Sequence, residues 1–249
     1  RIARTNIALC FPQWSAQERQ VCLRRHFYHW GRASLSVGIA WWGSPARLKG
    51  LVRFRGREHY DQALAQGRRV MLRAPHFVGL EMAGALLSME RHMVSMYKGP
   101  KNALFDWVMR RARARFDLIM IERSTGIRSI LRFMQTGRPF YYLPDQDPGE
   151  ASFEFVPFFG VPTATITAMS RIADMAKAVV IPCFIRQLPG GQGYEISFKP
   201  VMEGFPSGDL MHDVTRMNAE IEKGVREMPE QYMWTYKRFK TRPENTQCL

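Results

Sequence analysis

The sequence has few cysteines and no long apolar run, and each shortage excludes a class of protein. Its four cysteines, Cys10, Cys22, Cys183 and Cys248, show neither C-x-x-C spacing nor a neighbouring pair of histidines. A zinc site and a disulfide framework are therefore not indicated, and we expect a reducing compartment. No stretch reaches the roughly 18 to 20 apolar residues of a membrane-spanning helix. Because the chain starts at Arg1 rather than at a methionine, a membrane anchor ahead of this residue stays open.

Several catalytic signatures are absent as well. The sequence contains no G-x-S-x-G elbow, no Walker A loop and no H-E-x-x-H pair. The G-G-Q-G stretch at residues 190–193 has the composition of a turn, and nothing else resembles a dinucleotide-binding fingerprint. Serine hydrolases, P-loop NTPases, zinc proteases and dehydrogenases therefore lack support.

Acidic residues are scarce relative to basic ones. The chain has 36 Lys and Arg against 22 Asp and Glu, which gives a formal net charge of +14. Such an excess favours a polyanionic partner, either a nucleic acid or an anionic membrane surface with its headgroups. The charge alone does not choose between them.

Short apolar runs alternate with helical patterns along most of the chain. This alternation predicts an α/β fold, with a largely parallel central sheet flanked by helices in a single domain over residues 1–249. The segment 194–200 reads as a late edge strand. Strands are expected at residues 70–72, 118–121, 140–143 and 179–185, and helices at residues 80–87, 127–134, 164–176 and 210–227.

The first long helix combines aromatic and basic residues. Ser15 with Glu18 three residues later forms a capping-box signature, which predicts a helical segment reaching about Trp42. Its interleaved aromatic and arginine side chains suit a helix at a membrane interface, and they also suit an ordinary helix that packs on the core.

His76 and Glu81 are the first candidate catalytic pair. The spacing is a weak signal, because six histidines and 22 acids predict about half a chance H-x4-[DE] match. Five residues along one helix is a rotation of about 140°, so the side chains meet only if His76 precedes the helix. Pro75 and Gly79 favour that geometry, in which Glu81 would orient the imidazole as a general base. The alternative is a histidine that is hydrogen-bonded at a strand end.

A second candidate site follows the strand expected at 118–121. Arg123, Ser124 and Thr125 lie where a strand leads into a helix, and free N–H groups at such a position favour a phosphate or carboxylate. The alternative is a capped helix beside a solvated arginine.

The next stretch carries two acids and then an apolar segment. Asp145 and Asp147 match a D-x-D metal site, but the neighbouring prolines and glycine favour a turn. Phe158 and Phe159 belong to an uncharged segment that we expect to be a loop, exposed enough to contact an acyl chain or a membrane. Packing in the core is the alternative for both phenylalanines.

Taken together, these segments resemble the late acyltransferases of lipid A biosynthesis, which belong to the glycerolipid acyltransferase superfamily with the H-x4-[DE] motif. The resemblance covers essentially the whole chain. It is carried, in order, by NIALCFPQWSAQER, HFVGLE, DWVMRRARARF, IERSTGIRSILRFMQTG, YYLPDQDPGEASFEFVPFFGVPTAT and PEQYMWTYKRFKTRPE.

The resemblance implies an enzyme on the cytoplasmic face of the bacterial inner membrane, with an N-terminal membrane-anchoring helix ahead of Arg1. It would move a fatty acyl group from acyl carrier protein to a hydroxyl of a 3-hydroxyacyl chain on a Kdo-bearing lipid A precursor. His76 would be the general base and Glu81 its partner, with no metal ion and no cofactor beyond the acyl carrier protein thioester. Arg123 would hold either the oxyanion or a substrate phosphate.

The basic excess then matches three anionic partners: the precursor, the inner membrane surface and the acidic acyl carrier protein. The cluster Arg110, Arg111, Arg113 and Arg115 is a candidate for docking one of them, and the alternative is a solvated basic helix face. Nucleic acid is not expected as a partner. Three other functions stay open: an acyl-CoA-dependent acyltransferase of another membrane glycolipid, a basic module that binds membrane or nucleic acid, and a D-x-D glycosyltransferase.

Overall fold

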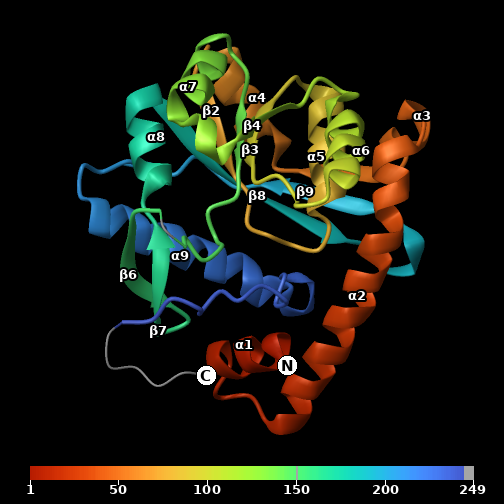
Figure 1. Ribbon diagram of the computed structural model, residues 1–249, viewed down its shortest axis with the longest axis vertical. Helices are drawn as coiled ribbons and strands as arrows, with labels where there is room; N and C mark the ends of the chain where they lie inside the picture. The colour runs from red at the N-terminus through yellow and green to blue at the C-terminus, as the bar shows by residue number, and fades with distance from the viewer. Residues whose placement is uncertain (150, 244–249) are drawn as a thin grey trace.

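A seven-stranded sheet forms the centre of the computed structural model, which describes residues 1–149 and 151–243 (Figure 1). The strand order is β1-β9-β8-β2-β5-β3-β4. Every neighbouring pair is parallel except β8 and β9, so the predicted largely parallel sheet is confirmed. The strands are β1 (Val52–Arg55), β2 (Arg69–Arg73), β3 (Val94–Tyr97), β4 (Ile119–Glu122), β5 (Phe140–Tyr142), β8 (Ala178–Gln187) and β9 (Tyr194–Phe198).

The strand β9 does not lie at the edge of the sheet, and this prediction was wrong. It pairs with β8 on one side and with β1 on the other. The edge strand on this side of the sheet is β1, whose V-R-F-R sequence alternates half-buried and exposed residues. Arginines at every second position suit an edge strand with one solvated face.

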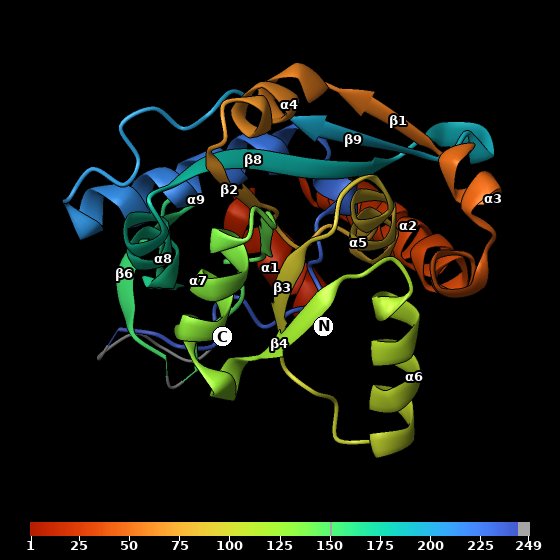
Figure 2. The same ribbon diagram turned by 90° about the horizontal axis from the view of Figure 1, so that it is seen from above.

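Helices cover both faces of the sheet. Figure 2 shows α4 on one side of β8, with α7 and α8 on the other. The helices turn apolar residues toward the core, and some of them also expose large apolar side chains. The helices are α1 (Ile2–Cys10), α2 (Ala16–Trp42), α3 (Pro45–Lys49), α4 (Arg57–Ala65), α5 (Leu80–Glu90), α6 (Ala103–Ala114), α7 (Ile127–Gln135), α8 (Ala168–Ala176) and α9 (Leu210–Glu227).

The predicted capping box at the start of α2 is present. The Ser15 hydroxyl accepts from the Glu18 amide at 3.2 Å, and the Glu18 carboxylate accepts from the Ser15 amide at 2.7 Å. The helix then runs along one side of the molecule to Trp42 (Figure 1). Two of the four free helix N–H groups are thereby satisfied at its first turn.

The F-E-F-V-P-F-F-G segment is not a loop. It forms strand β6 (Phe153–Phe158), which pairs antiparallel with β7 (Val161–Ile166) in a separate hairpin. Phe158 is 0% and Phe159 8% exposed. The expectation of an exposed apolar loop was therefore wrong, and the alternative, packing of both phenylalanines in the core, is confirmed. The helix expected from residue 164 begins only at Ala168, because the preceding residues complete β7.

The C-terminal segment is held against the loop that follows β2. The Met233 amide donates to the His76 carbonyl at 2.9 Å, and the Val78 amide donates to the Gln231 carbonyl at 2.9 Å. The Asn6 side chain in α1 donates to the Trp234 carbonyl at 2.8 Å. These hydrogen bonds fix the backbone around His76 from both ends of the chain.

No helix in the described part of the chain is long and apolar enough to cross a membrane. Cys10, Cys22 and Cys183 are buried free thiols, and Cys248 lies outside the described residues.

Candidate active site

The site is centred on His76 and Asp145, which follow two neighbouring parallel strands. In β2 and β5, Arg73 is the register partner of Tyr142. His76 and Asp145 each come three residues later, and each directly follows a proline. Because parallel strands end at the same edge of a sheet, the two loops bring these side chains together.

The contact between them is short and buried. His76 Nδ1 lies 2.6 Å from Asp145 Oδ1, and the His76 backbone amide donates to Asp145 Oδ2 at 2.8 Å. The Asp145 side chain is 1% exposed and the His76 side chain 12%. The carboxylate therefore fixes both the position of the ring and its tautomer, with the proton on Nδ1.

Two predictions about this region were wrong in their geometry. Asp145 was expected to be a turn residue, yet its carboxylate is the partner of the imidazole. Glu81 was expected to be that partner, yet both ring nitrogens of His76 are engaged by other residues. His76 does precede α5, as predicted, with Gly79 at the N-cap.

Electrostatics keep Asp145 ionised. Burial by itself would raise the pKa of this carboxyl group. The charge and hydrogen bonds of His76, helped by Arg238, outweigh burial and lower the pKa below its usual value. Burial, together with the carboxylate charge of Asp145, raises the pKa of the Tyr232 phenol well above its ordinary value. Tyr232 therefore remains protonated.

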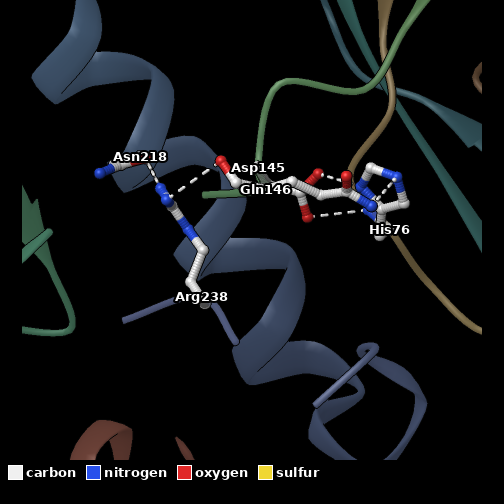
Figure 3. A network of polar contacts seen from close by, with 5 residues as sticks. All are labelled: His76, Asp145, Gln146, Asn218 and Arg238. Atoms are coloured by element: carbon white, nitrogen blue, oxygen red, sulfur yellow. Dashed lines mark hydrogen bonds and ion pairs between the residues drawn. The ribbon is translucent and has the colours of Figure 1, made fainter. Parts of the chain in front are cut away.

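The second ring nitrogen of His76 contacts Gln146, whose Nε2 lies 3.0 Å away (Figure 3). Behind this residue, Arg238 donates to the Ala164 carbonyl at 2.7 Å and to the Thr165 hydroxyl at 3.1 Å. Arg238 also reaches the Gln146 carbonyl, at 3.5 Å, and it is only 3% exposed. The loop that carries Asp145 and Gln146 is therefore braced from the protein interior.

Glu81 has a different role from the one predicted for it. Its carboxylate forms an ion pair with Arg113 of α6 and accepts from Trp41 Nε1 of α2 at 3.1 Å. Since Glu81 lies in the first turn of α5, this cluster ties three helices together. Sequence reasoning placed Arg113 only in a basic cluster, because 32 residues separate it from Glu81.

A cavity of about 540 Å³ opens beside His76. Its polar groups include those of Glu81, Arg113, Arg123 and Gln146, while most of its lining is apolar. A volume in this range is typical of sites for small-molecule and cofactor-sized ligands. The apolar lining includes Val37 and Trp41 from α2, Leu80 and Ala85 from α5, and Phe105 and Met109 from α6.

The remaining predicted residues lie around this cavity or away from it. Arg123 lines the cavity and follows β4, with α7 beginning four residues later, so the predicted strand-to-helix position is confirmed. Ser124 and Thr125 are exposed and outside the lining. Arg110 and Arg111 are exposed on α6. Phe158 and Phe159 are core residues that do not reach the cavity.

Asp147 behaves as the turn residue that was expected. Its carboxylate accepts from the Gly149 amide at 3.1 Å and from the Thr241 amide at 2.8 Å. Among residues 1–149 and 151–243, no three His, Cys, Asp or Glu side chains gather as metal ligands. The two acids of the D-x-D sequence therefore serve separate hydrogen-bond networks.

Comparison with known proteins decides the family. Residues 1–241 match the family described as bacterial lipid A biosynthesis acyltransferase. The chain belongs to this family. It is 34% identical, over its whole length and 81% of the relative, to the lipid A biosynthesis palmitoleoyltransferase of Escherichia coli K12. It is 33% identical to the lauroyltransferase of the same organism, over 98% of this chain and 80% of the relative.

A third relative is a lipid A biosynthesis acyltransferase of Haemophilus influenzae, 35% identical over 97% of this chain and 76% of that protein. The resemblance inferred from the sequence motifs is thus confirmed, and the chain is an acyltransferase. The matched residues include the His76 loop, the Asp145 loop and α6, which all contribute to the site.

The Glu81–Arg113 pair of this acyltransferase is open to a direct test. Both side chains are about four-fifths buried, so replacing Glu81 with alanine leaves the guanidinium without its charged partner. We expect the free energy of unfolding to fall by about 1.5–3 kcal/mol. Urea denaturation of Glu81→Ala, Arg113→Ala and the double variant measures the coupling. Strictly additive losses would show that the pair contributes no coupling energy.

Proposed function

We propose that this acyltransferase moves a fatty acyl group from acyl carrier protein to a hydroxyl of a 3-hydroxyacyl chain on a Kdo-bearing lipid A precursor. His76 is the general base. The observation that supports this role most directly is the buried His76–Asp145 contact of 2.6 Å at the wall of a largely apolar cavity.

The proton transfer uses Nε2 of His76, the ring nitrogen that does not contact Asp145. With the proton on Nδ1 directed at Asp145, Nε2 of neutral His76 carries no proton, so its lone pair can accept the proton of the acceptor hydroxyl. As the hydroxyl oxygen attacks the thioester carbonyl carbon, its proton passes to Nε2. The C–S bond then breaks, and the leaving thiolate takes the proton back. Asp145 stabilises the transient imidazolium.

The acyl groups of donor and acceptor are assigned to the cavity between α2, α5 and α6. Its apolar walls favour hydrocarbon chains, whose burial contributes roughly 0.8 kcal/mol per methylene. Glu81 acts here as a positioning residue, because it holds Trp41 and Arg113 in the cavity wall.

The charged groups of the substrates require cations. Arg123 lines the cavity at the end of β4, where it can donate either to the developing oxyanion or to a substrate phosphate. Arg110 and Arg111 are exposed on α6 and are assigned to docking the acidic acyl carrier protein. Ser124 and Thr125 remain candidates for contacts with the precursor headgroup at the same loop.

Location at the cytoplasmic face of the inner membrane is also part of the proposal. Two helices that line the cavity, α2 and α6, carry large exposed apolar side chains. Aromatic and aliphatic groups beside arginines are typical of surfaces that contact an anionic bilayer. The exposed side chains are Val21, Phe27, Tyr28, Trp30, Leu35 and Trp42 on α2, and Leu104, Phe105 and Trp107 on α6.

The decisive experiment is mass spectrometry of a lipid A precursor after incubation with the protein and a panel of acyl carrier protein thioesters. We expect the precursor to gain one acyl group, whose mass identifies the chain length. The matching acyl-CoA thioesters serve as the competing donors. Acylation from acyl-CoA alone would overturn the donor assignment, and an unmodified precursor with every donor would overturn the proposed acceptor.

A further inference from the structure

Gln146 engages the nitrogen that the proposed mechanism needs. Its Nε2 lies 3.0 Å from Nε2 of His76. Because Nδ1 of the ring donates to Asp145, the amide N–H of Gln146 is the donor and the His76 lone pair is the acceptor. Without substrate, the base is already hydrogen-bonded.

The backbone of Gln146 is fixed while its side chain faces the cavity. Asp145 is held by His76, and Asp147 accepts from Thr241, so the residues on both sides are anchored. The Gln146 carbonyl lies 3.5 Å from Arg238 Nη1. The half-buried side chain lines the cavity, so rotation about its own bonds uncovers Nε2 without moving Asp145.

The acceptor hydroxyl must take the place of this amide. A general base works within roughly 2.6–3.2 Å of the oxygen whose proton it removes, and the amide nitrogen occupies that position. An acceptor bound along the apolar cavity has many other contacts that offset the loss of one hydrogen bond. A single water molecule has no such additional contacts.

We infer that the Gln146 side chain is a displaceable cover on the general base, which the acceptor hydroxyl replaces and water does not. The inference rests on the proposed function, since it assumes that His76 is the base. It makes Gln146 a residue that determines specificity for a lipid hydroxyl over water.

The cover suppresses a definite side reaction. With the thioester bound and Nε2 uncovered, a water oxygen attacks the carbonyl carbon while its proton passes to Nε2. The C–S bond breaks, and the thiolate takes the proton back. The products are a free fatty acid and the donor thiol, so the donor is consumed without transfer.

The test compares donor hydrolysis with transfer in Gln146→Ala and Gln146→Asn. Alanine removes the amide, and asparagine keeps it on a side chain one methylene shorter that does not reach Nε2. With the thioester that supports transfer, we expect hydrolysis without acceptor to rise about tenfold in both variants. Thiol release measures hydrolysis, and mass spectrometry of the precursor measures transfer. The matched control is Gln62→Ala, an exposed glutamine on α4, which should leave both rates unchanged.

Unchanged or slower hydrolysis in the alanine variant, or wild-type hydrolysis in the asparagine variant, would overturn the inference. The double variant His76→Ala, Gln146→Ala separates it from the proposed function. We expect this variant to lose the extra hydrolysis, because the uncovered base is gone. Transfer that survives in His76→Ala alone would overturn the proposed function itself. If His76→Ala loses transfer but Gln146→Ala hydrolyses the donor at the wild-type rate, only the inference about Gln146 is overturned.

Discussion

Replacing His76 with alanine is expected to lower the rate of acyl transfer by about 10²–10⁴-fold, which is the usual contribution of a positioned general base. An alcohol is a poor nucleophile until its proton is removed. The amide of Gln146, which lines the cavity beside Nε2, is not a base and cannot take over this role. The fold should persist, because the backbone N–H and C=O of residue 76 keep their partners. Initial rates of precursor acylation, read by mass spectrometry, measure the effect.

The chain offers a matched control for this variant. His92 and Asp117 form a second His–Asp pair on the surface. Nδ1 of His92 lies 3.0 Å from Oδ2 of Asp117, and the His92 side chain is 66% exposed. His92→Ala removes the same side chain and the same kind of contact, away from the cavity. We expect it to transfer at the wild-type rate. A fully active His76→Ala variant would remove His76 from the mechanism.

Asp145→Asn should lower transfer by about 10²-fold or more although the side chain keeps its size. The neutral amide no longer stabilises the imidazolium, and its N–H₂ group can donate to Nδ1, which would place the ring proton on Nε2. The lone pair would then face away from the acceptor hydroxyl. Comparing kcat with KM for the precursor separates a loss of catalysis from a loss of binding, because both effects of the amide lower kcat and leave KM largely unchanged.

Asp117→Asn is the control for this second variant. Asp117 has the positive φ of 58° that asparagine tolerates, so the backbone conformation is kept. Its partners, His92 and Arg138, lie outside the cavity, and activity should not change. If Asp145→Asn retained wild-type kcat while Glu81→Gln lost it, Glu81 would replace Asp145 as the residue that supports the base.

The carboxyl group of Asp145 also makes the stability of the fold depend on pH in acid. Its pKa is lowered in the folded protein, so its contribution to stability is complete above its unfolded pKa of about 3.9. That contribution is lost as the pH falls through the folded value. The unfolding free energies of wild type and Asp145→Asn should therefore begin to converge as the pH falls below about 4.

The local sequence around His76 was informative because its signals are short-range. Pro75 and Gly79 mark a turn between a buried strand and a helix, and the structure has this turn with His76 before α5. The motifs that carried the family resemblance, such as H-F-V-G-L-E and P-D-Q-D, are likewise contiguous. Steric limits on the backbone and the periodicity of apolar residues act within a few positions, so the sequence displays them directly.

The partners of these residues could not be found in that way. Asp145 lies 69 residues from His76, and Arg113 lies 32 residues from Glu81. A proline before each of His76 and Asp145, at the same distance from two strand ends, was the available signal. It has meaning only once β2 and β5 are known to be neighbours, which long-range strand pairing decides.

The sequence by itself determined an α/β acyltransferase with a histidine in a strand-to-helix turn. The tertiary structure alone decided that Asp145 orients this histidine, that Glu81 ties α2, α5 and α6 together, and that Phe158 is buried in the core. The reason is physical. Strand and helix formation depends on neighbouring residues, whereas the pairing of charged groups and the burial of an apolar hairpin depend on which distant surfaces pack together.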